Sequence, residues 1–379
     1  MASTPLGPDE SRRLLELARS DRDAAAREVA SLSHAVQVAL VCDAPLAQRA
    51  ALLGVLPEPE AVIPQLPEAE LCFTVNAIGL ADSGWLLELA TPEQVVAAVD
   101  LDAWKGYELD LSALSDWVGA LADASQPALL RSARALDPEL LVLLLKSRLF
   151  VEQKPAGDED WQPPEATQTL EGQFYFRALG DKDDLADIVV LLRALFEEEY
   201  WTYFRLMQGV VWELESDTTE WALRWRSGRL EDLGFPPWDE AMPIYRFLSP
   251  EERVALPEKD REFAVEGWAL PVWLPQLPDA PDARRRVFRA IAELDPEERR
   301  SCFYEFVAVA NKLAVADRLP LSDAESTPQA IEKAARFMSD GIEHVAREHA
   351  LSDPAVLRRV SLERLFTIGA NLDPLAARP

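Results

Sequence analysis

The segment Trp221–Arg229 combines aromatic and basic side chains at a spacing suited to binding an anion. Trp221 and Trp225 are four residues apart, and Arg224, Arg226 and Arg229 lie between or beyond them. Residues four apart share one face of a helix. Guanidinium groups there would pair with a phosphate while an indole ring stacks on the ligand. The segment predicts an anion or nucleotide pocket; the alternative is that the tryptophans are core and the arginines pair with neighbouring acids.

A run of three carboxylates, Glu197, Glu198 and Glu199, precedes Tyr200. At helical spacing these acids spread over almost a full turn, so we expect at least one to face the apolar side. A buried glutamate would serve as a metal ligand or as a general base with a raised pKa. This supports one alternative function: an enzyme, or a small-molecule or anion sensor, with its pocket between the Glu197–Glu199 and Trp221–Arg229 helices.

The small number of histidines argues against the common catalytic triads and metal-binding sites. There are three: His34, His344 and His349. No GxSxG elbow, phosphate-binding loop or GxGxxG motif accompanies them. No Glu-x-x-His pair occurs, and the acid–histidine cluster at 343–349 is typical of a solvated helix face. We therefore expect no metal and no cofactor, and favour a non-enzymatic protein, without excluding an enzyme that works with carboxylates alone.

Composition narrows the class of partner. The 379 residues include 66 acidic and 38 basic side chains, for a formal charge of −28. Such a chain repels phosphate backbones, which excludes nucleic acid and favours basic protein surfaces or divalent cations. The three cysteines have no CxxC spacing, which fits a reducing compartment. Without a signal peptide or an apolar stretch of membrane-spanning length, we expect a cytoplasmic protein.

The stretch Leu56–Asp123 holds 13 of the acids and a single basic residue, Lys105. Its apolar runs are interrupted by Pro-Glu steps at 57–58, 67–68 and 92–93. Each run is too short to bury an apolar face alone, so the pattern predicts a stack of short helices. We predict that this stack presents an acidic docking face, with most of its acids in solvent. The predicted face comprises Glu58, Glu60, Glu68 and Glu70.

Helix signals recur along the rest of the chain. Thr91, Ser249 and Asp295 each precede a proline and are followed three residues later by Glu or Gln, which predicts capping boxes. Apolar residues at a spacing of three or four over 188–214 predict one long helix, or two broken near Gly209. Residues 173–178 alternate polar and aromatic side chains, which predicts a short strand or an extended docking segment. The segment 256–283, rich in proline and tryptophan, predicts a long packed loop.

These signals predict an all-α protein with two domains. An acidic helical-repeat domain, 9–150, is followed by a linker rich in proline and acids, 151–172. A mostly helical C-terminal domain then covers 173–379.

Two stretches resemble known families. LPEAEL and GLADSGWLLELATPEQVVAAVDLDAW resemble the short-helix repeat in the cytoplasmic N-terminal domain of MgtE-type magnesium transporters. The flagellar motor switch protein FliG carries a related superhelix. Over its whole length the chain resembles more closely an uncharacterised family of bacterial proteins that join such a repeat to a second helical region, a match suggested by Glu220–Tyr245.

The repeat resemblance covers roughly residues 45–150 and implies an armadillo- or HEAT-like superhelix. No transmembrane or paired cystathionine-synthase-type region follows, so the resemblance does not imply a transport function. The charged helix that would imply a flagellar role is not found in the sequence. The function we expect is a non-enzymatic interaction or regulatory protein that docks a basic partner on the acidic repeat. The resemblance and the charge favour a divalent-cation sensor as a second alternative.

Overall fold

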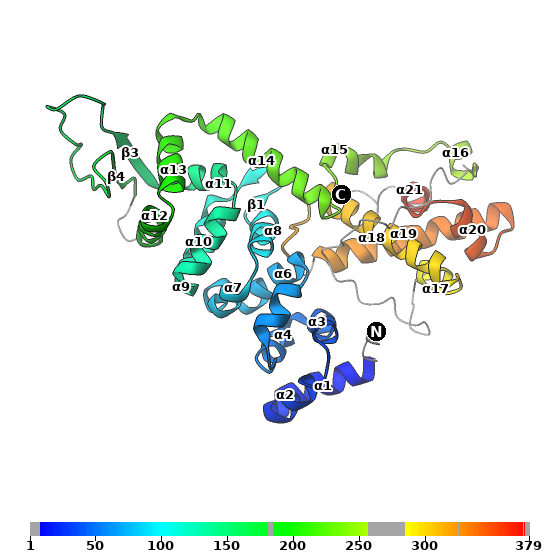
Figure 1. Ribbon diagram of the computed structural model, residues 1–379. Coiled ribbons are helices and arrows are strands. Elements are labelled where there is room, and N and C mark those ends of the chain that lie inside the picture. The colour runs from blue at the N-terminus through cyan, green and yellow to red at the C-terminus, as the bar shows by residue number, and fades with distance from the viewer. Residues whose placement is uncertain (1–7, 181–184, 257–284, 324–325, 374, 376–379) are drawn as a thin grey trace. The chain divides into compact units, whose positions relative to one another are not determined.

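The computed structural model describes residues 8–180, 185–256, 285–323, 326–373 and 375. Helix makes up 72% of the described residues, and two small β-hairpins complete the regular structure there. The chain divides into two compact units, unit 1 (Met1–Arg226) and unit 2 (Ser227–Pro379) (Figure 1). The prediction of a mostly helical protein is confirmed.

Unit 1 is a succession of short helices. They are α1 (Pro8–Ser20), α2 (Arg22–Val29), α3 (His34–Asp43), α4 (Leu46–Leu53), α5 (Pro59–Val62), α6 (Glu68–Ile78), α7 (Gly84–Leu89), α8 (Pro92–Asp102), α9 (Leu111–Ala124), α10 (Gln126–Ala135), α11 (Pro138–Arg148), α12 (Ala186–Glu198) and α13 (Tyr200–Trp212). Two 3₁₀ turns, η1 (Ile63–Gln65) and η2 (Leu80–Asp82), lie among them. Helix α14 (Glu215–Asp232) begins in unit 1 and ends in unit 2.

Local sequence explains where these helices start and stop. Thr91 and Gln94 form the predicted capping box of α8, with Pro92 at the first helical position. Helix α6 ends at Gly79, whose φ of 99° is a conformation that favours glycine. Neighbouring helices then supply the core that each short helix lacks: α6 packs on α4 and α8, and α7 packs on α9.

The predicted linker is part of a β-hairpin. Strand β3 (Leu149–Gln153) pairs antiparallel with β4 (Phe174–Ala178), and Val151 lies opposite Phe176. Phe174 and Phe176 are buried, so burial and strand pairing tie both ends of the segment 151–172 into unit 1. The predicted strand at 173–178 is confirmed, whereas the predicted domain boundary differs from the division between the two units. A second hairpin joins β1 (Trp104–Lys105) to β2 (Glu108–Leu109).

The pattern over 188–214 forms two helices, but the break lies at Glu199 rather than near Gly209. Glu199 leaves the helical conformation, with φ −137° and ψ 53°, between α12 and α13. Gly209 instead lies inside α13, where an added Cβ would come within 2.7 Å of a methyl carbon of Val142. The glycine therefore serves the close approach of α13 to α11, which pack on each other.

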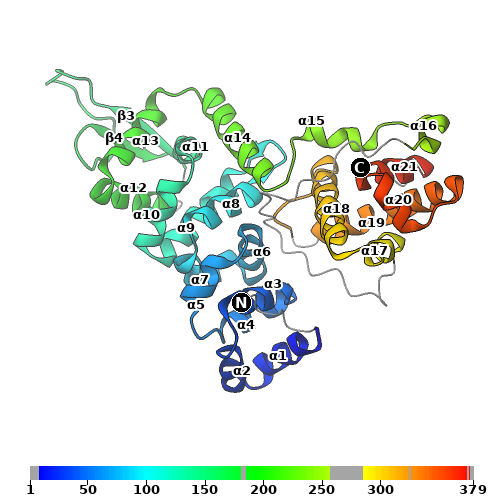
Figure 2. The same cartoon turned by 45° about the vertical axis from the view of Figure 1, so that its right-hand side comes forward.

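Unit 2 is built around two crossing helices. Its helices after α14 are α15 (Trp238–Ala241), the 3₁₀ helix η4 (Met242–Tyr245), α16 (Pro250–Val254), α17 (Arg286–Ala292), α18 (Pro296–Ala316), α19 (Ser326–His349), α20 (Asp353–Arg359) and α21 (Leu362–Leu372) (Figure 2). Helix α19 packs closely on α21, and α18 contacts both. A Cβ added at Gly341 or Gly369 would collide with the backbone of the opposite helix, so two glycines permit this crossing. The predicted loop at 256–283 lies, but for Leu256, outside the described residues.

Candidate functional site

The predicted acidic face is only partly accessible. Glu58 and Glu60 are exposed and Glu68 is half-buried. Glu70, however, is buried at 4% exposure, and its Oε2 lies 2.6 Å from Nη1 of Arg49. The expectation that Glu70 faces solvent is wrong, because α6 packs on α4 and α8 and leaves this side of the helix inside unit 1.

Other acids of the stretch 56–123 are exposed at the surface of unit 1. Seven exposed carboxylates form no ion pair within the described residues: Glu60, Asp82, Glu88, Glu93, Glu108, Asp116 and Asp123. The one basic residue of the stretch, Lys105, pairs with Asp110 at 2.6 Å. Between 56 and 123 the surface of unit 1 is therefore almost purely negative.

One part of this surface also carries an exposed indole. Trp85, in α7, is 41% exposed. Asp82 lies in η2 and Glu88 in α7, and α7 packs on η2 and η1; η1 in turn contacts α5, which carries Glu60. We name Glu60, Asp82, Trp85 and Glu88 the α7 surface.

The predicted anion pocket at Trp221–Arg229 is divided between a buried and an exposed side of α14. Arg226 is 5% exposed, and its Nε donates a hydrogen bond of 2.7 Å to the Asp100 carbonyl. Trp221 and Trp225 are about half exposed and stack with their ring centroids 6.1 Å apart. The exposed Arg224 lies over the Trp221 ring. Successive residues of a helix point in different directions, and Arg226 lies on the side of α14 that packs inside unit 1, so it does not join Trp221 and Trp225.

The remaining residue of that prediction, Arg229, is half-buried. The structure therefore brings together Trp221, Arg224 and Trp225 but not all five residues. The alternative of core tryptophans does not hold for these two, because both indoles are substantially exposed.

The carboxylate run does not supply a buried acid. Glu197 and Glu198 are exposed, and Glu199 forms an ion pair with Arg134. Among the described residues, no group of three or more His, Cys, Asp or Glu side chains is placed to hold a metal ion. At the acid–histidine cluster, Nε2 of His349 lies 2.6 Å from the Val254 carbonyl oxygen, and Nδ1 of His344 is 3.3 Å from Arg347.

Unit 2 contains a pocket that the sequence did not indicate. Its volume is about 640 Å³, within the range of small-molecule sites. It lies between the segment 234–246 and the helices α18 and α21. Three cationic side chains line it, Arg246, Lys312 and Arg364, and the acids Glu231, Glu240, Glu305 and Glu363 line it as well.

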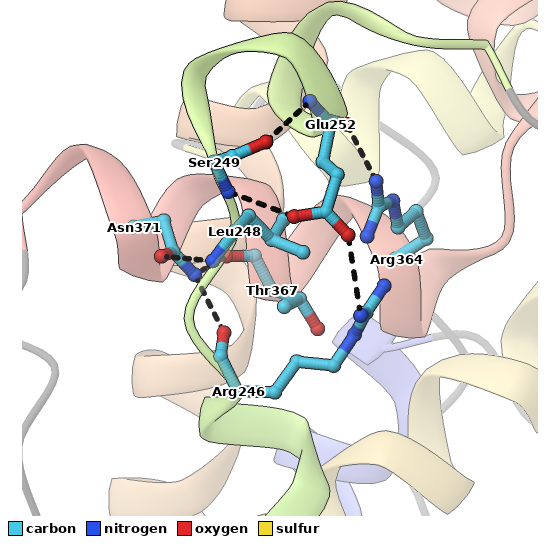
Figure 3. A network of polar contacts seen from close by, with 7 residues as sticks. All are labelled: Arg246, Leu248, Ser249, Glu252, Arg364, Thr367 and Asn371. Atoms are coloured by element: carbon cyan, nitrogen blue, oxygen red, sulfur yellow. Dashed lines mark hydrogen bonds and ion pairs between the residues drawn. The ribbon is translucent and has the colours of Figure 1, made fainter.

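A polar network supports the arginine side of this pocket (Figure 3). Ser249 and Glu252 form the predicted capping box of α16. The carbonyl oxygen of Glu252 accepts a hydrogen bond of 2.5 Å from Nη2 of Arg364, and its carboxylate lies 3.6 Å from Nη1 of Arg246. Asn371 donates to the carbonyl of Arg246 at 3.0 Å. The network thus holds the two arginines at the same site although they are far apart in sequence.

The lysine of the pocket is already paired. Nζ of Lys312, in α18, lies 2.9 Å from Glu363. Glu305, also in α18, is buried and accepts a hydrogen bond of 2.7 Å from the backbone N–H of Leu362, where it satisfies the start of α21. Two sequence signals lie near this site, the capping box at Ser249 and the family-like stretch Glu220–Tyr245, and neither predicts a pocket.

A family model matches residues 26–373, which include parts of both units. The chain belongs to DUF6178, a family of unknown function. No curated protein and no solved structure gave a significant match. Membership in DUF6178 agrees with the resemblance to an uncharacterised family. No helix in the described part of this DUF6178 chain is long and apolar enough to cross a membrane.

Proposed function

We propose that this protein is a cytoplasmic, non-enzymatic interaction or regulatory protein that docks a basic segment of a partner protein on the α7 surface. We also propose that the short helices between 45 and 150 form a superhelical repeat of the kind found in the MgtE-type N-terminal domain. The observation that carries the proposal is the set of seven exposed, unpaired carboxylates between 56 and 123.

The distribution of charge supports a basic partner. Unit 1 contains 39 Asp and Glu residues against 18 Lys and Arg, a formal charge of −21, whereas unit 2 carries −7. A surface of one sign raises the association rate of a partner of opposite sign and repels partners of like sign. The negative charge is thus concentrated on the unit that carries the proposed docking site.

Trp85 supports the choice of the α7 surface within unit 1. Charge alone steers an encounter, while a partly exposed aromatic side chain supplies the apolar contact that holds a complex. Tryptophan is enriched among the residues that dominate binding energies at interfaces. A basic segment whose lysine or arginine stems lie along the indole would use both features at once.

A test begins by selecting linear peptides from a displayed random library on the full chain. The affinity of the selected peptides is then measured by fluorescence anisotropy across a salt series. We expect peptides rich in Lys and Arg, with an affinity that falls as salt rises. Trp85→Ala, which alters no charge, should weaken binding about thirtyfold, the effect of losing about 2 kcal/mol.

A matched pair of triple variants separates a local site from general charge. Glu60→Gln, Asp82→Asn and Glu88→Gln together should slow association markedly. Three other exposed, unpaired acids of unit 1, neutralised together as Glu159→Gln, Glu197→Gln and Glu220→Gln, make the same change in net charge and should leave affinity nearly unchanged. Equal losses of affinity in the two triple variants, or selected peptides without basic residues, would contradict docking on the α7 surface.

A further inference from the structure

The pocket of unit 2 contains a cation whose hydrogen bonds are incomplete. Arg364 uses Nη2 to donate to the Glu252 carbonyl, but its Nε and Nη1 are buried and have no hydrogen-bond partner. A guanidinium carries five N–H donors, and a buried donor without an acceptor costs free energy. Arg364 therefore carries at least two donors that no acceptor of the described residues satisfies.

The electrostatic surroundings of Arg364 also favour an added anion. Burial lowers the pKa of Arg364 from its ordinary value, and the positive charge of Arg246 lowers this pKa further, against the opposing effect of Glu252. Two cations that share one pocket wall repel each other, and an anion placed between them would relieve that repulsion.

The nearby acids are already committed to other groups. One Glu252 oxygen accepts from the backbone N–H of Ser249 at 2.8 Å, within the capping box. Glu305 accepts from the N–H of Leu362, and Glu363 pairs with Lys312. These carboxylates hold the helices of unit 2 together. A carboxylate or phosphate from outside the chain is thus the natural acceptor for Arg364.

We propose that this pocket binds a small organic anion whose carboxylate or phosphate group is held by Arg364 and Arg246. The pocket volume of about 640 Å³ is large enough for a metabolite-sized molecule and much larger than a bare inorganic ion needs. Because a guanidinium presents its N–H donors in pairs along an edge, the ligand should offer two acceptor oxygens on one group. Carboxylates and phosphates both do, and arginine binds either class.

The two remaining acids of the pocket restrict which chemical groups the rest of the ligand can carry. Glu231 and Glu240 line the pocket but are exposed, so water already solvates their charges. They would accept hydrogen bonds from hydroxyl or amino groups and would repel a second anionic group. We therefore infer a ligand with one acidic group and a hydroxylated or amine-bearing remainder.

The test uses the full chain and measures binding by isothermal titration calorimetry at fixed ionic strength, set with sodium chloride. The probes are glycerol 3-phosphate, a hydroxylated phosphate; glycerate, a hydroxylated carboxylate; and glycerol, the neutral control. We expect saturable one-site binding of at least one anionic probe and no binding of glycerol. Which anion binds more tightly assigns the ligand to the phosphate or the carboxylate class.

Variants locate the site. Arg364→Gln should weaken binding of the anion at least about tenfold, while Arg359→Gln, an exposed arginine of unit 2 outside the pocket lining, should leave it unchanged. If Arg364→Gln does not fold, Arg246→Gln provides the same test, because more than half of the Arg246 side chain is exposed. Absence of binding by both anions, or equal binding by the pocket variants and Arg359→Gln, would overturn the proposal.

Binding of a basic peptide on the α7 surface is a separate property of unit 1, so either proposal can fail without the other. A triple substitution on the α7 surface should leave anion titrations unchanged.

Discussion

Removing Arg49, a buried arginine of unit 1, should be far more damaging than removing a surface arginine. Arg49 and Glu70 are 6% and 5% exposed in their side chains and form an ion pair at 2.6 Å. Arg49 also donates to the carbonyls of Ala44 at 3.1 Å and Cys42 at 2.9 Å, and to the Thr74 hydroxyl at 3.1 Å. The substitution Arg49→Met keeps most of the side-chain volume and removes all of these donors.

The magnitude follows from the burial of the pair. Breaking a buried ion pair from one side leaves an uncompensated charge and costs about 3–5 kcal/mol. Replacing both partners removes that charge, so Arg49→Met with Glu70→Met should cost less than Arg49→Met alone. The double variant retains the loss of the bonds to the two carbonyls, which keeps it below the wild type in stability.

Hydrogen–deuterium exchange of peptides covering α4 and α6 is the suitable assay, because a chain of two units need not unfold in one step. Arg49→Met should reduce the protection of both helices, and Arg13→Met should change it little, because the Arg13–Glu28 pair is exposed. Unchanged protection in Arg49→Met, or a double variant less protected than the single one, would refute the reasoning.

Three further predictions concern other parts of the chain. Gly369→Ala should lower the stability of unit 2 by about 3 kcal/mol or more in denaturant unfolding, because the added Cβ would collide with the Phe337 carbonyl. A denaturant unfolding curve like that of the wild type would contradict this prediction. Burial lowers the pKa of His344 below 6.5, so its contribution to stability should decline as the pH falls from 6.5 toward the folded-state pKa; His344→Gln should flatten that slope, and an unchanged slope would exclude this histidine. Arg226→Met should destabilise unit 1 by about 2 kcal/mol, because the buried Asp100 carbonyl loses a charged donor; equal exchange protection near α8 in both proteins would count against it.

The sequence by itself determined where many helices begin. Thr91, Ser249 and Asp295 cap their helices as their spacing predicts, because a capping box involves only residues three apart. The strand at 174–178 was also visible in its alternation, whereas its pairing with 149–153 was not. Pairing joins segments separated by a long connection, and no local pattern specifies it.

Tertiary packing decided which charged groups face solvent. Glu70 and Glu60 both belong to Pro-Glu-rich stretches, yet one is buried beside Arg49 and the other is exposed. Arg226 lies among residues that the sequence groups as one site, yet its side chain is committed to the Asp100 carbonyl. Helical spacing indicates which residues share a face but not which face the neighbouring helices cover.

The pocket of unit 2 depended on tertiary structure most of all. Arg364 meets the carbonyl of Glu252 across 112 residues of chain, and Glu305 reaches Leu362 across 57. Composition supplies the charges and capping signals supply the helices, but only the packing of the segment 234–246 on α18 and α21 brings those charges to one cavity. Whether a buried donor lacks an acceptor depends on that packing. The amino-acid sequence alone therefore does not reveal the unsatisfied donors of Arg364.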